Sequence, residues 1–285
     1  MKKFISGVAV VAAVVAVAVV VAGEKERSSE QPKCFTNYTV VAQCEEVPVL
    51  HDEADLVLTS FTYSDGSVYE GYINTSDEFI NDETHVLSGR GMITFTSGAT
   101  YKGYFMNSLR HGWGEHTYVD GSVYSGCWRE DIKHGKGSFH YGSDHALPGA
   151  SYVGEWNGGD KHGHGEYFSD KLQYCGDFVR GEFQGEGQLL RHDDDSFYEG
   201  RFKGNVRHGY GSMTYGNGNT YVGDWEGGLK CGTGRFSDST SGVTYVGEWS
   251  DDKMHGKGKL IFADGFEVPG HWDKGSLIRE TIQNL

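Results

Sequence analysis

The sequence predicts an all-β chain in which tight turns join short strands, and three observations point to this class. Glycine accounts for 43 of the 285 residues, against an average use of roughly 7%, and glycine weakens helices. Proline occurs only 4 times and no Gly-x-y triplet persists, which excludes a collagen-like chain. Aromatic residues make up 13% of the chain, which is too much apolar surface for a disordered linker.

A repeat of about 23 residues organises most of the chain. Nine copies begin at Tyr69, Tyr101, Tyr124, Tyr152, Tyr174, Tyr198, Tyr221, Tyr245 and, in a degenerate form, Val268. All nine have glycine two positions later, and eight have an aromatic residue four positions later. Seven also carry a Gly-x-Gly at 11 and 13 positions. These slots account for the excess of glycine.

Each copy is expected to form one β-hairpin. In Tyr221-Val-Gly-Asp-Trp225, strand alternation puts Tyr221, Gly223 and Trp225 on one face. Asp-Gly and Asn-Gly pairs between the strands are typical of hairpin turns. A lone hairpin is marginally stable, so the copies must stack. We therefore predict an elongated, twisted, single-layer sheet over residues 56–275, whose aromatic row lines a groove because no second layer covers it.

The amino-terminal segment differs from the repeats. Residues 1–23 contain a charge-free run from Phe4 to Ala22, close to the length of a membrane-spanning helix. We expect a hydrophobic helix that is either an uncleaved signal anchor or a signal peptide that is removed. Residues 24–55 are polar and are expected to form a stalk.

The carboxy-terminal residues 276–285 are expected to form a short capping helix. Ser276 can accept the first N–H groups of a helix, and apolar residues follow it at helical spacing.

Several features favour a compartment outside the cytoplasm. A short basic tail before a hydrophobic span usually stays cytoplasmic, which leaves the repeats on the other side. Asn37 and Asn74 lie in N-glycosylation tripeptides. Cys34 and Cys44 bracket a segment that a disulfide could close. The expected protein is a single-pass membrane protein with non-cytoplasmic repeats, or a secreted one.

The net charge of −15 argues against nucleic acid as a partner, because phosphate backbones repel an acidic chain. It equally means that any phosphate-binding site needs a local basic patch.

The repeat resembles the MORN repeat. Tyr245-Val-Gly-Glu-Trp249, followed by Met254-His-Gly-Lys-Gly258, carries the resemblance, which covers residues 56–275. The family implies β-hairpin rods that often dimerise, organise other proteins or lie beside membranes. It therefore implies a non-catalytic scaffold that binds protein partners or itself.

Two sets of side chains are candidates for binding. The first is the aromatic row, expected to contact a partner in the groove: Tyr101, Tyr124, Trp128, Tyr152, Trp156, Tyr198, Tyr221, Trp225, Tyr245 and Trp249. The second is a basic stripe near the hairpin bends: Arg110, His111, Lys133, His134, Lys161, His162, Arg207 and His208. The alternative function is a peripheral module in which this stripe binds phosphoinositide headgroups. The competing structural interpretation is that the stripe packs on the rings of the next repeat.

No motif for catalysis or metal binding stands out. His192-Asp193-Asp194-Asp195 is interpreted as a solvated turn, because it lacks the ligand spacing of a calcium loop. His162 and His164 flank a glycine of the repeat and resemble a metal pair only superficially. The repeat pattern already explains most carboxylates and histidines. The sequence therefore predicts no enzyme, no metal and no cofactor.

Overall fold

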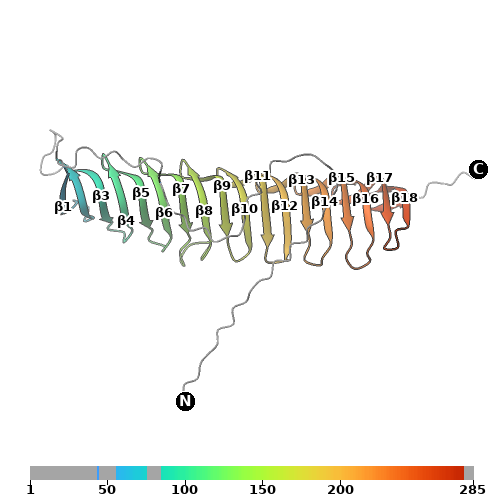
Figure 1. Ribbon diagram of the computed structural model, residues 1–285. Coiled ribbons are helices and arrows are strands. Elements are labelled where there is room, and N and C mark those ends of the chain that lie inside the picture. The colour runs from blue at the N-terminus through green and yellow to red at the C-terminus, as the bar shows by residue number, and fades with distance from the viewer. Residues whose placement is uncertain (1–43, 45–55, 76–84, 279–285) are drawn as a thin grey trace, which may run out of the picture. The chain divides into compact units, whose positions relative to one another are not determined.

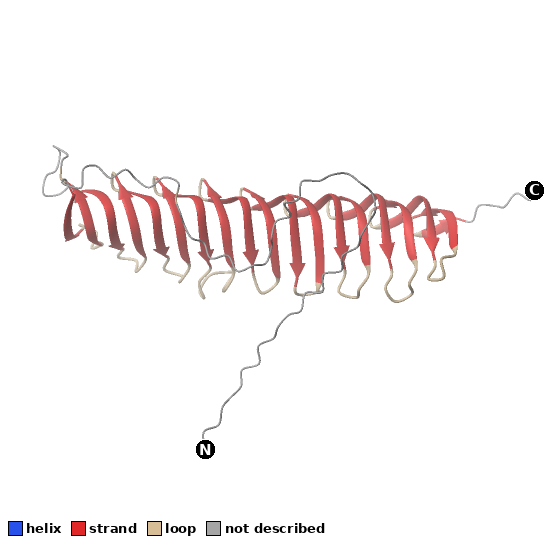
Figure 2. Ribbon diagram, viewed as in Figure 1, coloured by secondary structure: helices blue, strands red, loops and turns tan. Residues whose placement is uncertain are grey.

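The computed structural model describes residues 44, 56–75 and 85–278, and these form one antiparallel sheet of 19 strands without a helix (Figure 2). The strands are β1 (Leu56–Thr62), β2 (Val68–Asn74), β3 (Val86–Thr94), β4 (Thr100–Met106), β5 (Leu109–Thr117), β6 (Val123–Arg129), β7 (Ile132–His140), β8 (Ser151–Asn157), β9 (Asp160–Phe168), β10 (Leu172–Val179), β11 (Glu182–Arg191), β12 (Ser196–Lys203), β13 (Val206–Thr214), β14 (Thr220–Glu226), β15 (Leu229–Ser237), β16 (Thr244–Ser250), β17 (Lys253–Ile261), β18 (Glu267–Asp273) and β19 (Ser276–Ile278). The prediction of an all-β sheet is confirmed.

Sheet order follows chain order, because each strand pairs with the strands before and after it (Figure 1). Among the described residues β1 pairs with β2 alone and β19 with β18 alone, so the sheet does not close on itself. Each repeat supplies two neighbouring strands, such as β14 and β15.

A bulge at the Gly-x-Gly interrupts the eight hairpins from β2–β3 to β16–β17. In β14 and β15, Gly223 lies opposite Gly234, but the next pair is Asp224 with Cys231, so Gly232 and the residue after it are extra. Gly232 has a φ of +53°, a left-handed conformation that favours glycine. Such bulges bend a strand and increase its twist. The first glycine of the Gly-x-Gly is therefore a backbone requirement.

The second glycine lies under a tyrosine ring. A Cβ atom added at Gly234 would come within 2.5 Å of Cε2 of Tyr221, which is closer than van der Waals contact allows. The ring is held there because its hydroxyl donates to the carbonyl of Asp224 at 3.1 Å. Eight tyrosines make the same bond to the residue three positions later, at 2.7–3.1 Å: Tyr69, Tyr101, Tyr124, Tyr152, Tyr174, Tyr198, Tyr221 and Tyr245.

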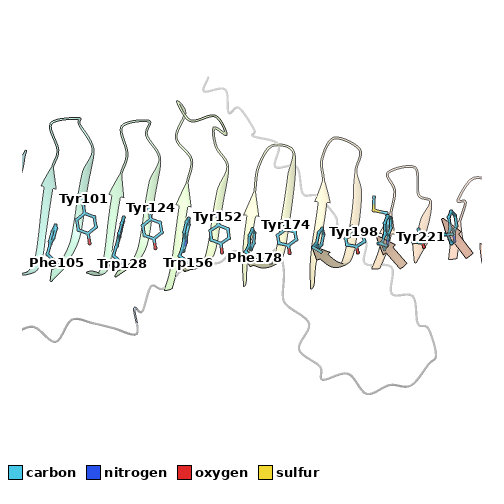
Figure 3. Close-up of a cluster of buried hydrophobic side chains, with 14 of the residues drawn as sticks. Tyr101, Phe105, Tyr124, Trp128, Tyr152, Trp156, Tyr174, Phe178, Tyr198 and Tyr221 are labelled. Carbon is cyan, nitrogen blue, oxygen red and sulfur yellow. The ribbon is translucent and has the colours of Figure 1, made fainter. Parts of the chain in front are cut away.

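The rings of successive repeats form a continuous buried row (Figure 3). Tyr221 meets Trp225 of its own strand edge-on at 5.1 Å and Trp249 of the next repeat at 5.3 Å. The indole N–H of Trp225 donates to the carbonyl of Gly211 at 3.3 Å. Aromatic pairs prefer this edge-to-face geometry, so the row joins one repeat to the next.

The prediction that the aromatic row lines an open groove is wrong. The ten predicted contact residues, from Tyr101 to Trp249, are 0–7% exposed. Side chains from the second strand of the hairpins, such as Lys133, Phe183 and Lys230, lie over the rings. A single sheet therefore buries its own core, and a partner has to contact other residues.

The predicted capping helix does not begin at Ser276. Ser276–Ile278 form β19, in which Leu277 pairs with Trp272 of β18. This strand completes the last hairpin and leaves Trp272 2% exposed. Residues 279–285, the predicted hydrophobic helix at 1–23 and the stalk, apart from Cys44, lie outside the described residues. Within the described part, no helix is long and apolar enough to cross a membrane.

Candidate interaction site

The basic residues of the predicted stripe occupy one structural position, which we call the cover position. It lies directly across the hairpin from the fourth residue after the start of each repeat. Its occupants along the chain are Leu87, Arg110, Lys133, Lys161, Phe183, Arg207, Lys230, Met254 and Leu277. Because both apolar and basic residues occur there, the shared role of the position is to cover the ring row.

The contacts of the cover position bear this out. The guanidinium carbon of Arg110 lies 4.2 Å from the centre of the Trp128 ring. The Nζ of Lys133 lies 4.4 Å from the centre of the Phe139 ring. Phe183 takes the same place in its repeat and stacks on Tyr174 at 3.7 Å. Long basic side chains bury their stems and keep a charge over an aromatic face. The structural interpretation of the stripe is therefore supported.

Of the five covering cations, Arg110 is the one that forms an ion pair among the described residues. Arg110 pairs with Asp131 of the next turn at 2.8 Å, whereas glycine stands at the corresponding turn positions beside Lys133 and Lys161. Neither lysine forms an ion pair among the described residues. Burial, with repulsion from Arg110 and Lys161, lowers the pKa of Lys133 to about 8. Burial alone lowers the pKa of Lys161 to about 8.

The predicted histidines do not form an exposed ladder. His111 is buried, while His134, His162 and His208 are half-buried. The backbone of His162 is engaged as well, since its carbonyl accepts a bond from the Tyr152 hydroxyl at 3.3 Å.

The repeat pattern did not single out His116, which lies among these rings. It is 7% exposed. Burial, with repulsion from Arg110 and Lys133, lowers its pKa to about 4.

The other sequence candidates are accounted for locally. Asp193 accepts from Arg191 at 2.7 Å and Asp194 from the Ser196 hydroxyl at 2.6 Å, so these carboxylates stabilise their turn. His164 faces Asp177 at 3.6 Å.

Asn74 of the glycosylation tripeptide is 6% exposed, and Asn37 lies outside the described residues. In the described part of the chain, no group of three or more His, Cys, Asp or Glu residues could hold a metal ion.

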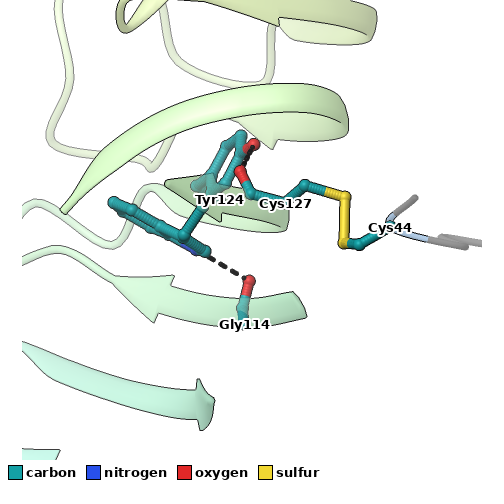
Figure 4. Close-up of a disulfide and its surroundings, with 5 residues drawn as sticks. Cys44, Gly114, Tyr124 and Cys127 are labelled. Atoms are coloured by element: carbon teal, nitrogen blue, oxygen red, sulfur yellow. Dashed lines mark hydrogen bonds between the residues drawn. A yellow bond between two sulfur atoms is a disulfide. The ribbon is translucent and has the colours of Figure 1, made fainter. Parts of the chain in front are cut away.

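A disulfide joins Cys44 to Cys127 of β6, 83 residues apart in sequence (Figure 4). The suggested closure of a short loop between Cys34 and Cys44 is therefore wrong. Cys175 is also disulfide-bonded, and Cys231 is a free thiol. Side chains of a strand point to opposite faces in turn, and Cys127 is three residues after Tyr124 in β6. Cys127 therefore lies on the face opposite the rings, which we call the outer face.

The outer face carries a groove of about 820 Å³ across β1–β5. Its floor is the glycine row Gly71, Gly91 and Gly103, and its walls include Leu58, Arg90, Met92, Lys102, Tyr104 and Trp113. The Nε–H of Arg90 donates to the Tyr104 hydroxyl at 2.7 Å. Leu58 is 69% exposed and both Met92 and Trp113 are 37% exposed, so the groove presents apolar surface to solvent.

The sequence did contain a signal for this groove. Trp113 is the one tryptophan of the six that falls outside the repeat's aromatic slot, because it stands between the two glycines of a Gly-x-Gly. That place lies on the outer face, whereas the slot tryptophans lie in the core.

This fold and these surfaces define a β-hairpin repeat protein. The model of the MORN repeat family matches residues 101–123, 124–145, 152–172, 174–196, 198–220, 221–243 and 245–266. The matches cover more than half of the chain, which therefore belongs to the MORN-repeat family. Repeats of this family form interaction modules that are generally non-catalytic.

Other comparisons add little. No curated protein matches the sequence. Among solved structures, the TCP10 domain of Danio rerio CPAP, in complex with a STIL peptide, is 8% identical with a TM-score of 0.35, over 76% of this chain and 100% of that one. The Drosophila melanogaster SAS-4 TCP domain, in complex with a proline-rich motif of Ana2, is 10% identical with a TM-score of 0.28, over 81% and 99%. Scores this low carry no inference about this chain.

Proposed function

We propose that this MORN-repeat chain is a non-catalytic scaffold that binds a protein partner, or a second copy of itself, through the outer face of its sheet. The groove across β1–β5 carries the proposal. The repeat's own aromatic rings are used inside the core, whereas the groove exposes Leu58, Met92 and Trp113. Exposed apolar patches of this kind mark interaction sites.

Site-directed photocrosslinking tests this function. The full chain is expressed in cells with a benzoylphenylalanine in place of Trp113, or in place of Tyr210 as a matched control. Tyr210 also stands between two glycines of a Gly-x-Gly and is 62% exposed, but it lies far along the sheet from the groove. We expect one polypeptide, identified by mass spectrometry, to crosslink at position 113 and to bind again as a purified protein. A chain that crosslinks to nothing at either position and is monomeric by light scattering would contradict the scaffold function.

We further propose that the repeats lie outside the cytoplasm, on a protein that residues 1–23 anchor in a membrane or that is secreted. The bonds at Cys127 and Cys175 support this, because disulfides persist in oxidising compartments. Protease treatment of sealed microsomes from cells that express a carboxy-terminally tagged chain is the test. We expect the tag to be protected until detergent is added; digestion in intact vesicles would place the repeats in the cytoplasm.

A second candidate function is recognition of phosphoinositide headgroups, favoured by the unpaired ammonium groups of Lys133 and Lys161. Isothermal titration calorimetry of the full chain with a soluble inositol polyphosphate should then show saturable binding. Charge reversal at both lysines should abolish this binding. Charge reversal at exposed Lys136 serves as the control. Absence of binding even at low salt would eliminate this function, since such contacts are strongest there.

A further inference from the structure

We infer that the groove across β1–β5 is the docking site for an extended, acidic and apolar segment of a partner protein, an inference that rests on the proposed scaffold function. Four properties of the groove lead to this ligand: its direction, its length, its charge and its place in the sheet.

The groove crosses the strands instead of running along one. Its floor glycines pair with one another, Gly71 with Gly91 and Gly91 with Gly103, so the floor lies in the middle of the hydrogen-bonded ladder. A ligand over these glycines finds no strand edge to extend. Among the described residues, the unpaired edge belongs to β1, at one end of the groove. Recognition must therefore come from side chains, and the ligand's backbone keeps its hydrogen bonds to water.

The length of the groove suits a short extended segment. Strands about 4.8 Å apart make the distance from β1 to β5 about 19 Å. An extended chain advances about 3.3 Å per residue, so about six residues fill the groove.

The charge of the groove runs against that of the chain. Arg90 and Lys102 line it together with one acid, Glu70, although the whole chain carries a net charge of −15. Neither cation forms an ion pair among the described residues, and Arg90 is held over the Tyr104 ring at 5.0 Å. A ligand carboxylate would be met by a guanidinium that is already oriented, while Met92 and Trp113 receive apolar side chains.

Other repeats lack this combination on the outer face. Two of the equivalent positions further along hold polar pairs instead of Arg90 and Tyr104: His164 lies 3.6 Å from Asp177, and Arg201 lies 3.7 Å from Glu186. The apolar groove is therefore a property of one end of the sheet, which fits a single docking site better than a repeated one.

Selection from a displayed library of random 12-residue peptides tests the inference, with the full, disulfide-bonded chain as the target. We expect enriched peptides to combine apolar residues with Asp or Glu. Their affinity should fall at least about tenfold in W113S and in the double variant R90E/K102E, as for truncated hot spots. It should stay within about twofold in Y210S, the matched control.

Three results would overturn the inference: enriched peptides without acidic residues, equal binding to W113S and wild type, or a synthetic peptide of residues 45–55 as the sole ligand, which would assign the groove to the chain itself. The scaffold function would survive any of these if photocrosslinking still identifies a partner at another outer-face position. It fails separately if no position crosslinks.

Discussion

At the scale of the residue, the repeat is a set of positions in which the backbone and one tyrosine impose glycine. The first glycine of each Gly-x-Gly has a left-handed φ, between +53° and +62° in seven repeats. The second lies beneath the tyrosine ring. The glycine of Tyr-x-Gly meets the same ring and the facing glycine backbone. Glycine here is thus a steric requirement and no sign of flexibility.

The substitution G234A tests this requirement. At an ordinary strand position alanine is more stable than glycine, by roughly 0.5–1 kcal/mol. Here the added methyl group collides with Tyr221, so we expect a loss of about 1–3 kcal/mol, as for an overpacked core. Chemical denaturation of G234A measures the change, and R235A, at the exposed neighbouring position, should stay within about 0.5 kcal/mol. The loss should shrink in a Y221L background; an unchanged loss would mean that the ring is not the cause.

The lysines at the cover position should make stability depend on pH. Their folded pKa of about 8 lies below the unfolded value of about 10.4. The unfolded chain therefore binds more protons between these values, and the free energy of unfolding should rise with pH from about 8 toward 10. In K133M/K161M, which copies the Met254 repeat, we expect higher stability at pH 7 and a flatter profile. Denaturation at pH 7–9.5 checks this, with K136M as the exposed control. A profile with the wild-type slope would contradict it.

At the scale of the element, each hairpin combines a fixed ring with an exchangeable cover. The tyrosine, its bond to the bulge carbonyl and the aromatic residue four positions later recur from repeat to repeat. The cover varies from leucine to lysine to phenylalanine. A long stem that reaches over the rings is the common requirement, and a charge at its end is optional.

Phe183 allows this exchange to be tested. F183A removes the ring that stacks on Tyr174 at 3.7 Å, so we expect a loss of about 2 kcal/mol in the free energy of unfolding. F183K restores a long stem, as in the neighbouring repeats, and should lose less than half as much. Denaturation of the two variants in parallel provides the measurement. Equal losses would show that the ring, and not the cover, is required.

At the scale of the whole molecule, the described sheet has the organisation of a one-dimensional array. Every strand pairs with its neighbours in sequence, and each ring meets rings of its own or adjacent repeats. Stability is then close to a sum of repeat and interface contributions. The disulfide between Cys44 and Cys127 adds a long-range connection, between residues 83 positions apart in sequence.

Removing one complete repeat should therefore leave the rest folded. Deletion of residues 198–220 brings Tyr221 into the place of Tyr198, opposite Leu189 of β11. We expect a cooperative unfolding transition whose denaturant dependence falls by about a tenth, in proportion to the surface lost. Deletion of a single strand is the control, because it reverses every later strand and should prevent folding. Loss of all structure on whole-repeat deletion would contradict the array model.

The sequence alone was enough to predict the strands, because a hairpin's turn residues, glycine slots and alternation are local properties that recur every 23 or so residues. It also located the row of rings. It could not decide whether that row is open or buried, because burial depends on how far the bulges bend the strands and on how the cover residues of a neighbouring strand lie over the rings. Tyr101 and Trp128 were thus correctly placed in register and wrongly placed at the surface.

The disulfide and the groove needed the tertiary structure for a related reason. Cys44 and Cys127 lie far apart in sequence, and no local pattern reports which cysteines a fold brings together. Arg90, Met92, Tyr104 and Trp113 come from three different strands and form a groove only when those strands pair. The sequence by itself determined the repeat and its sheet, since both follow from short-range sterics. Which face carries a core and which is free to bind was decided by packing between strands.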